Sequence, residues 1–366
     1  MKISAAVARA FNAPLSIEEV ELDEIRDDEI LVRLVATGVC HTDAAVIEGL
    51  MGTELPVVLG HEGAGVVEKV GRAVTKVAPG DHVVMTVDSC GHCPACMEHD
   101  ITYCHNSYPM NFMAQRPDGT RGISKDGERI GSMFFGQSSY ATHSVCHEAN
   151  CVKVPKDVEL EKLGPLGCGI QTGAGTVMNA LAVKPGKSIV IFGAGGVGLA
   201  GVMGAVVQGA TTIIVVDMVD SRLELAKELG ATHTFNAKTD DVSEEIMKLT
   251  GYGVNYAFDT TGNAKVIRQA VELLAPKGTC AIVGASSPEA ELALNETHFM
   301  SGGRRLMGVV EGEANPDIFI PTMIALWQQG RFPFDKLITF YPFEEINEAF
   351  AASARGEAIK PILRFA

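Results

Sequence analysis

The pattern of apolar and polar positions changes partway along the chain. Before about residue 160, short apolar runs such as 29–39 and 63–71 are separated by Gly, Pro and Asp, which predicts a strand-rich domain with irregular loops. From Lys187 onward, strand-like runs alternate with helical stretches, as in 188–194 followed by 198–210. Strand and helix in alternation predict right-handed βαβ units and a parallel, doubly wound sheet.

Further elements are predicted near the end of this region and after it. The segment AKVIRQAVELLAPKG (264–278) is expected to be the helix between two strands. After about residue 310 the alternation fades, and helices are predicted at 318–332 and 343–357. The last residues, KPILRFA, favour a final strand.

One stretch, 188–216, has no charged residue and is long enough to cross a bilayer. Its seven glycines and β-branched end favour a strand, a tight turn, a buried helix and a second strand instead. The N-terminal residues carry too many charges for the apolar core of a signal peptide. We therefore expect neither a membrane span nor a secretion signal in this sequence.

Composition narrows the class of protein further. A chain of 366 residues favours two domains, and 46% hydrophobic against 20% charged residues favours a large core over disorder. The formal net charge is −15, from 30 Lys and Arg against 45 Asp and Glu. A nucleic-acid binder or a protein docking on an anionic membrane needs a basic face, so no nucleic-acid or membrane partner is expected.

Four of the nine cysteines lie in the segment CGHCPACMEHDITYC, with the spacing C-x2-C-x2-C-x7-C. Two residues between thiolates let one tight loop direct both sulfurs at one ion, and tetrahedral zinc accepts four sulfurs. An iron–sulfur cluster also uses such spacing and is the alternative. The sequence favours a closed, structural zinc site made by Cys90, Cys93, Cys96 and Cys104.

A glycine-rich turn follows the strand predicted at 188–192. Its residues are Gly193, Gly195, Gly196, Val197 and Gly198. With a strand before it and a helix after it, the turn predicts a dinucleotide site in which the helix N-terminus receives the pyrophosphate. Asp217 ends the next predicted strand and is expected to bind the adenosine ribose hydroxyls, so NAD is favoured over NADP.

A dispersed metal site is also conceivable from Cys40 in GVCHTD, His61 in GHEG and Cys168 in GPLGCG. A catalytic zinc needs three protein ligands and one open position, and two cysteines with one histidine can supply them. Spacing alone does not establish this set, because a lone cysteine or histidine is more often structural.

Over nearly its whole length the chain resembles the zinc-dependent medium-chain alcohol dehydrogenases. The motif GHEGAGVVEKVG, the four-cysteine loop and the GAGGVG turn occur in that family's order. The segments FFGQSSYATH (134–143), 154–177 and SYPMNF (107–112) are most similar to the aryl-alcohol, or benzyl-alcohol, branch. The resemblance implies an α/β protein with a mainly β GroES-like catalytic domain at 1–170, a Rossmann domain at 171–310, and residues 311–366 returning to the first domain.

The resemblance also implies a catalytic zinc held by Cys40, His61 and Cys168, besides the structural zinc, which makes two zinc ions per chain. Asp43 and Glu62 are then carboxylates that orient the ligands. Thr42 occupies the position that accepts the substrate proton. Many members pass this proton to a histidine at the position of Ala45, so we hypothesise that His41 replaces it.

For the cofactor, the resemblance implies further contacts with NAD. The residues at matching positions are His41 and Lys360 for the phosphates, Arg222 for the ribose, and Thr172, Val283, Gly284 and Ala285 for the nicotinamide.

The expected function is reversible oxidation of a primary aromatic alcohol to its aldehyde by hydride transfer to NAD. The alternatives are another primary alcohol, S-hydroxymethylglutathione, or a zinc- and dinucleotide-binding protein without activity. Apolar residues at 110, 112, 113, 134 and 135 fit either a substrate pocket or plain core. We expect a cytoplasmic homodimer or homotetramer, with Cys146, Cys151 and Cys280 as free thiols.

Overall fold

The computed structural model describes residues 1–285 and 289–365, which form two compact units. Unit 1 holds Met1–Cys168, Asn315–Thr322 and the chain from Asp335 onward, and unit 2 holds Gly169–Ala314 and Met323–Phe334. The sequence placed all of 311–366 with the first domain. In the structure, residues 311–314 and 323–334 belong to unit 2, because helix α10 (Pro316–Gln328) starts in one unit and ends in the other.

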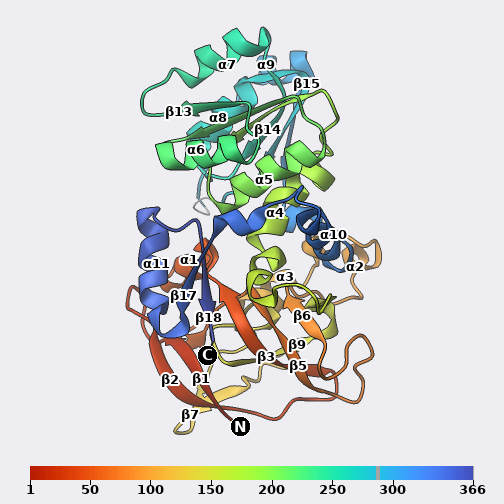
Figure 1. Ribbon diagram of the computed structural model, residues 1–366, viewed down its shortest axis with the longest axis vertical. Helices are drawn as coiled ribbons and strands as arrows, with labels where there is room; N and C mark the ends of the chain where they lie inside the picture. Colours follow the sequence, from red (N-terminus) through yellow and green to blue (C-terminus); the bar gives the residue numbers. More distant parts are fainter. Residues whose placement is uncertain (286–288, 366) are drawn as a thin grey trace. The chain divides into compact units, whose positions relative to one another are not determined.

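Unit 1 is built on two sheets, as the short apolar runs predicted (Figure 1). The first has the strand order β4-β1-β2-β7-β8, with bounds β1 (Lys2–Ala8), β2 (Ser16–Leu22), β4 (Val57–Val58), β7 (Ile123–Lys125) and β8 (Glu128–Ile130). The second has the order β10-β6-β5-β3-β18-β17, with β9 also paired to β3. Its strands are β3 (Glu29–Gly38), β5 (Gly63–Val70), β6 (His82–Met85), β9 (His143–His147), β10 (Cys151–Val154), β17 (Ile338–Pro342) and β18 (Lys360–Arg364).

Strand β3 joins the two hydrophobic cores of this unit. Successive side chains of a strand point to opposite faces. Ile30, Val32 and Leu34 accordingly pack in one core and Leu31 in the other, all of them buried. The apolar run 29–39 therefore has few polar positions because both of its faces are covered. Short helices α1 (His41–Ile47), α2 (Pro94–Met97) and α3 (Ser107–Phe112) lie in the connections, and α11 (Ile346–Arg355) precedes β18.

Strand β18 confirms the predicted C-terminal strand. It pairs antiparallel with β3, so that Ile362 lies opposite Gly38, and Val39 donates its N–H to the carbonyl of Pro361. This pairing brings Lys360 beside the segment that follows β3, where Cys40 and His41 lie.

Unit 2 contains a six-stranded, all-parallel sheet in the order β13-β12-β11-β14-β15-β16. Its strands are β11 (Ser188–Phe192), β12 (Thr212–Asp217), β13 (His233–Asn236), β14 (Val254–Asp259), β15 (Leu274–Ile282) and β16 (Arg305–Gly308), and its helices are α4 (Gly169–Gly175), α5 (Gly196–Val207), α6 (Asp220–Glu228), α7 (Val242–Thr250), α8 (Ala264–Glu272) and α9 (Glu296–Gly302). Side chains of α7, α8 and α9 share one core with the sheet, and α5 and α6 lie on the other face (Figure 1). This is the doubly wound arrangement that the alternation predicted.

One predicted helix is too long. Helix α8 ends at Glu272, and residues from Leu274 belong to β15, whereas the sequence predicted a helix through 278. Pro276 has no N–H for a helix interior, and the apolar residues before it suit either element.

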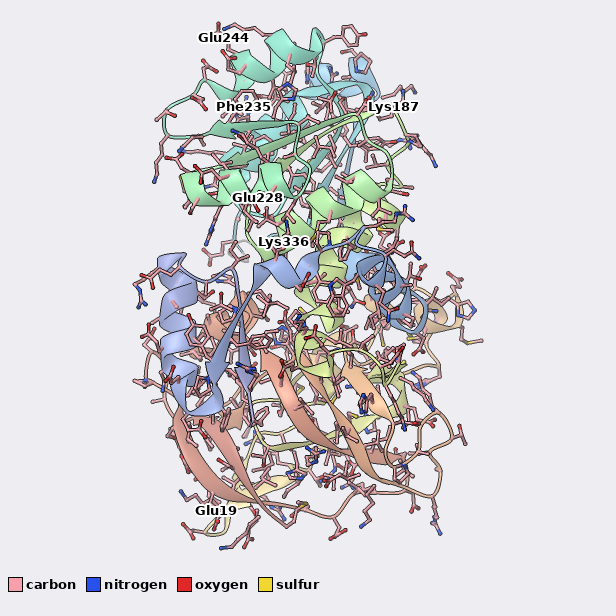
Figure 2. All side chains as sticks on the ribbon, viewed as in Figure 1. Glu19, Lys187, Glu228, Phe235, Glu244 and Lys336 are labelled. Atoms are coloured by element: carbon pink, nitrogen blue, oxygen red, sulfur yellow. The ribbon has the colours of Figure 1, made fainter. Side chains whose placement is uncertain are left out.

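Acidic side chains such as Glu228 in α6 and Glu244 in α7 lie on exposed surface (Figure 2).

The uncharged stretch 188–216 forms β11, the buried helix α5 and β12, as predicted. Within the described part of the chain, no helix is both long enough and apolar enough to cross a membrane.

Candidate functional site

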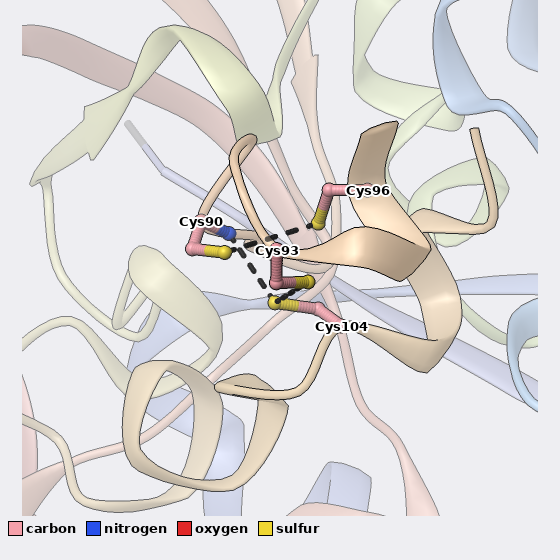
Figure 3. A group of neighbouring side chains, drawn as sticks. All are labelled: Cys90, Cys93, Cys96 and Cys104. Carbon is pink, nitrogen blue, oxygen red and sulfur yellow. Dashed lines mark hydrogen bonds between the residues drawn. The ribbon is translucent and has the colours of Figure 1, made fainter. Parts of the chain in front are cut away.

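The four cysteines of the loop 90–104 converge on one point (Figure 3). The Sγ atoms of Cys90, Cys93, Cys96 and Cys104 all lie within 4.8 Å of one another. Two of the separations, Cys90 to Cys96 and Cys93 to Cys104, are 4.0 Å. Sulfurs bound to one tetrahedral zinc at about 2.3 Å are spaced on this scale. The structure thus brings together the complete set that the spacing predicted.

Backbone groups support the charge that a metal needs at these sulfurs. Cys93 Sγ accepts the N–H of His105, and Cys104 Sγ accepts those of Cys90 and Asn106, each at 3.4 Å. Burial opposes ionisation of Cys90, but donors led by the His92 N–H lower its pKa to about 5. Burial and the neighbouring Cys93 sulfur raise the pKa of Cys96 to about 12. Four adjacent thiolates therefore need a cation to balance them, which fits a metal centre.

A second cluster of metal-binding side chains gathers where β3 ends. Cys40, His61, Glu62 and Cys168 each offer an atom within 4.8 Å of the others, although they come from three distant segments. Cys40 is the residue before α1, His61 and Glu62 precede β5, and Cys168 follows a 3-10 turn. Among the residues that the structure describes, Nε2 of buried His61 has no hydrogen-bond partner. A buried, unpaired nitrogen facing two thiols is the donor set that zinc accepts.

Asp43 fixes the orientation of His61. Its Oδ1 lies 3.1 Å from His61 Nδ1 and accepts the N–H of Gly60 at 3.0 Å. Its Oδ2 accepts a hydrogen bond of 2.8 Å from the hydroxyl of Tyr140. All four residues are fully or almost fully buried. The carboxylate therefore directs Nε2 toward the cluster, as a carboxylate behind a histidine ligand does. Tyr140 was not predicted, because nothing in its local sequence marks a partner 97 residues away.

Lys360 is paired with Glu62 beside the same cluster. Its Nζ donates to Glu62 Oε1 at 2.8 Å, to Oε2 at 2.9 Å and to the carbonyl of Val39 at 3.3 Å. Glu62 packs tightly against Gly38, where a Cβ would lie 2.0 Å from Oε2. All three ammonium donors of Lys360 thus point at protein oxygens. The phosphate contact that the family resemblance implies for Lys360 stays a prediction.

The pKa values follow from these contacts. A hydrogen bond from Cys168, opposed by burial and aided by the charge of His61, holds the pKa of Cys40 well below its ordinary value. Burial favours neutral His61, but Asp43 and Cys40 raise its pKa well above the usual range. Burial raises the pKa of Glu62 to about 7, although Lys360 lowers it. A Cys40 thiolate is the protonation state that a metal requires.

Thr42 and His41 lie at the start of α1, next to this cluster. Cys40 Sγ lies 3.9 Å from Thr42 Oγ1, so the hydroxyl borders the candidate ligands. The His41 side chain is exposed. The arrangement is compatible with the predicted proton path from Thr42, and that path stays a prediction.

Aromatic rings surround His61 on its other side. The Phe135 ring stacks on the imidazole at 4.5 Å, and Phe134 meets it edge-on at 5.8 Å. Phe112 contacts Phe135 at 5.0 Å, and Tyr108 stacks on Phe112 at 5.6 Å. Tyr108 is 55% exposed, whereas Phe134 is fully buried. A continuous path of rings, which we call the aromatic cluster, therefore leads from the surface to a candidate metal ligand.

A cavity of about 490 Å³ lies elsewhere in unit 1, beside the four-cysteine loop. Cys90, His92, Met110, Met133 and His147 are among the residues that line it. It includes none of Cys40, His61 and Cys168, so it is not assigned to the chemistry of that cluster.

The glycine turn of unit 2 has the geometry of a dinucleotide site. Gly193 has φ of 95°, which favours glycine, and a Cβ on Gly198 would lie 1.8 Å from the Gly193 carbonyl. A Cβ on Gly195, in contrast, would meet nothing within 4 Å, so the backbone there is open to a ligand. Gly196 and Val197 begin α5, whose N–H groups can receive a phosphate. These residues fit the predicted cofactor.

Asp217 ends β12, next to this turn. Its Oδ2 accepts the N–H of Ala194 at 2.6 Å, and its Oδ1 accepts those of Met218 and Val219. The carboxylate thus ties the turn to the next strand. Arg222 lies in the first half of α6, and its buried Nε has no partner among the described residues. Both positions are at the carboxyl edge of the sheet, where the ribose contact was predicted.

The residues predicted at the nicotinamide lie in α4 and after β15. Val283, Gly284 and Ala285 follow β15 directly. Thr172, in α4, donates its hydroxyl to Glu311 Oε2 at 3.3 Å, and Gln171 Nε2 donates to the same oxygen at 3.1 Å. Neither Glu311 nor Gln171 was predicted from the sequence.

Comparison with known proteins agrees with this geometry. Two family models match: the alcohol dehydrogenase GroES-like domain over residues 26–156 and the zinc-binding dehydrogenase over 196–328. Geraniol dehydrogenase of Castellaniella defragrans is 45% identical over 363 residues, which are 99% of this chain and 97% of that protein.

Two solved structures are similar over the full length. An alcohol dehydrogenase zinc-binding domain protein from Burkholderia ambifaria has 49% identity and a TM-score of 0.99, covering 100% of this chain and 99% of its own. Benzyl alcohol dehydrogenase from Acinetobacter calcoaceticus has 44% identity and a TM-score of 0.98, covering 100% of both chains. The fold and the metal-binding side chains define a zinc-type alcohol dehydrogenase. The chain belongs to the zinc-dependent medium-chain alcohol dehydrogenase family.

Proposed function

We propose that this enzyme oxidises primary aromatic alcohols of the benzyl type to aldehydes, using NAD⁺ and two zinc ions per chain. Its relatives include proteins named geraniol dehydrogenase and benzyl alcohol dehydrogenase. Geraniol is allylic and benzyl alcohol is benzylic, so both carry the hydroxyl on a carbon next to a π system. A geraniol-like allylic alcohol is therefore the second candidate substrate.

The aromatic cluster is the observation that carries this proposal. Its Phe135 ring lies 4.5 Å from a ligand of the proposed catalytic zinc, and its Tyr108 end is exposed. A substrate ring that lies against such side chains gains about 0.5–1.5 kcal/mol for each aromatic pair, beyond the area it buries. A short aliphatic alcohol gains none of this.

The chain's own residues divide the remaining work. A zinc ion on Cys40, His61 and Cys168 would supply the Lewis acidity that lowers the pKa of the alcohol. Asp43 holds the His61 ring, and the Lys360 ammonium keeps the Glu62 charge balanced beside the thiolates. Thr42, with its hydroxyl at the edge of the ligands, takes the alcohol proton, and exposed His41 passes it to solvent because Ala45 cannot.

The substrate preference is tested by measuring kcat/KM for benzyl alcohol, cinnamyl alcohol, geraniol, ethanol and S-hydroxymethylglutathione with zinc-loaded enzyme. We expect benzyl and cinnamyl alcohols to exceed ethanol by at least about a hundredfold, from several aromatic contacts together. Equal values for ethanol, or a clear preference for the glutathione adduct, would refute the aromatic assignment.

A variant pair links this preference to the aromatic cluster. Phe112→Leu is expected to lower the ratio of kcat/KM for benzyl alcohol to that for ethanol by roughly 2- to 12-fold, the value of one aromatic pair. Phe11→Leu, at a half-exposed site in the same unit, is the matched control and should leave the ratio unchanged.

Cofactor and metal content need separate measurements. Asp217 should repel a 2′-phosphate, so we expect NAD⁺ to be preferred over NADP⁺ by at least about tenfold in kcat/KM. Better use of NADP⁺ would show that the role given to Asp217 is wrong. Elemental analysis should find two zinc ions per chain, and a single ion would indicate the structural site alone.

A further inference from the structure

The turn that follows β16 carries an acidic side chain on an uncommon backbone. Glu311, Gly312 and Glu313 have φ values of 49°, 67° and 49°. Side-chain-bearing residues rarely adopt such angles unless their surroundings impose them. Here Gly312 meets α4 backbone to backbone, because a Cβ on it would lie 2.5 Å from the carbonyl oxygen of Gln171. Asn179 Nδ2 also donates to the Gly312 carbonyl at 3.2 Å.

These contacts fix the position of the Glu311 carboxylate. Its Oε2 accepts hydrogen bonds from Gln171 Nε2 at 3.1 Å and from Thr172 Oγ1 at 3.3 Å. Gln171 is fully buried, and Glu311 is partly buried. The strained turn and two side-chain donors therefore hold one negative charge against α4.

The sheet topology relates this charge to the predicted dinucleotide site. In a doubly wound sheet, a dinucleotide lies across the carboxyl ends of the strands, with one nucleotide over each half. The glycine turn and Asp217 assign the adenosine half to β11 and β12, so the nicotinamide half belongs to β14, β15 and β16. Glu311 lies three residues beyond Gly308, the last residue of β16. Its anchor, α4, also packs against the start of α5, since a Cβ on Gly173 would lie 1.9 Å from the Val197 carbonyl.

We propose that Glu311 sets the balance between the two redox forms of the bound cofactor, because its carboxylate stabilises the cationic nicotinamide of NAD⁺ and gives no such advantage to the neutral ring of NADH. The proposal rests on the proposed function, since it requires a nicotinamide cofactor at this site. Glu311 would then be a residue whose charge makes the enzyme discriminate between NAD⁺ and NADH.

The charge effect is large enough to measure. In a partly solvated site, a carboxylate beside a cationic ring attracts it strongly enough to change a dissociation constant by about tenfold. Glu311→Gln keeps an acceptor oxygen for Gln171 and Thr172 but removes the charge. The ratio of Kd for NAD⁺ to Kd for NADH should therefore rise by about tenfold, mainly through weaker binding of NAD⁺.

The test measures NADH binding by its fluorescence and NAD⁺ binding by competition, on zinc-loaded wild-type and variant enzymes. If the wild type binds neither form, the proposed function fails and this inference fails with it. If the wild type binds both and Glu311→Gln leaves the ratio within twofold, only the inference is overturned. Equal weakening of NAD⁺ and NADH binding in Glu311→Gln also overturns the inference. That result would show that Glu311 only anchors α4 and that its charge does not distinguish the two redox forms.

Two further variants complete the test. Glu311→Asp keeps the charge and should keep the ratio within about threefold of wild type, and it remains informative if Glu311→Gln folds poorly. Glu313→Gln removes a charge from the same turn, from a residue with the same φ, and is the matched control. An unchanged ratio in Glu313→Gln alongside a shift in Glu311→Gln would locate the effect at Glu311, whereas equal shifts would refute a specific role.

Discussion

Replacing Tyr140 by Phe tests whether residues behind His61 support the proposed catalytic zinc site. The Tyr140 side chain is fully buried, and its hydroxyl donates to Asp43 Oδ2 at 2.8 Å. Burial and the charge of Asp43 raise the pKa of Tyr140 well above its ordinary value, so the phenol stays protonated and remains a donor. The variant removes this hydrogen bond and a longer one of 3.5 Å to the carbonyl of Gly38, while the ring can keep its packing against Phe350, 6.0 Å away.

The size of the effect follows from what Asp43 loses. A hydrogen bond to a charged group contributes about 1.5–3 kcal/mol. In the variant, Asp43 Oδ1 still contacts the His61 imidazole and accepts the Gly60 N–H. Its Oδ2 no longer accepts the hydrogen bond from the Tyr140 hydroxyl. Changes behind a metal ligand typically weaken metal binding about 10- to 100-fold. The two estimates agree, since about 1.4 kcal/mol corresponds to tenfold.

Zinc transfer to a chromogenic chelator measures this effect with a control inside the same molecule. We expect Tyr140→Phe to release the zinc at Cys40, His61 and Cys168 at least about tenfold faster than wild type. Release from the four-cysteine loop should not change, because that loop does not include Tyr140 or Asp43. Tyr252→Phe, at a site that is 75% exposed, is the control for tyrosine loss as such.

Either of two results would refute a specific role of Tyr140 at His61. If both zinc ions leave at wild-type rates and the melting temperature falls equally with and without zinc, Tyr140 supports only the core. Faster release of both ions together would point to general loosening of unit 1 and would equally refute a specific role at His61.

Three further substitutions have definite expectations. Glu18→Gln removes a carboxylate that accepts hydrogen bonds from Arg9 and Lys125. The hydrogen bond from Arg9 is the main cause that holds the pKa of Glu18 below its ordinary value, although burial opposes it. The variant should therefore lose about 1–2 kcal/mol of unfolding free energy at pH 7. A carboxyl whose pKa is lower in the folded than in the unfolded protein stabilises the fold at pH values above its unfolded-state pKa, and this stabilisation is lost as the pH falls. Urea titrations should therefore show the stability difference between wild type and variant shrinking below about pH 4.5. A constant difference down to about pH 2 would contradict this. Gly195→Ala should weaken NADH binding about tenfold at an unchanged melting temperature, because its Cβ enters open space where the pyrophosphate approaches. Gly198→Ala should lower the melting temperature, and the reverse pattern in this pair would contradict the assignment of the turn.

The features that the sequence predicted well are those that a short segment encodes. The four cysteines lie within one loop, and the glycine turn lies between one strand and the next helix, so local spacing sufficed for both. The trio Cys40, His61 and Cys168 needed a family resemblance, because only the paired sheets and the 3-10 turn before Cys168 bring these segments together. The predicted end of α8 was wrong, because Leu273 and Leu274 suit a helix or a strand equally.

Contacts between residues far apart in the sequence could not be predicted, even where the residues themselves were. Tyr140 meets Asp43 across 97 positions, Gln171 meets Glu311 across 140, and Lys360 meets Glu62 across 298. Each looks like an ordinary residue in its own segment. Their roles depend on which strand ends share an edge, and this is a property of the topology that no local pattern contains.

The Lys360–Glu62 ion pair explains how the buried metal-binding cluster can contain a carboxylate without leaving its charge unpaired. Glu62 is fully buried beside two cysteines, and an uncompensated carboxylate there would cost several kcal/mol. Lys360 neutralises it from the C-terminal strand, through contacts with both carboxylate oxygens. A divalent ion then balances the two thiolates, and the Asp43 carboxylate, hydrogen-bonded to His61 and Tyr140, is the one negative charge that remains among these residues. Without Lys360 the Glu62 carboxylate would add a second, so the dependence of the site on C-terminal strand β18 is electrostatic as well as structural.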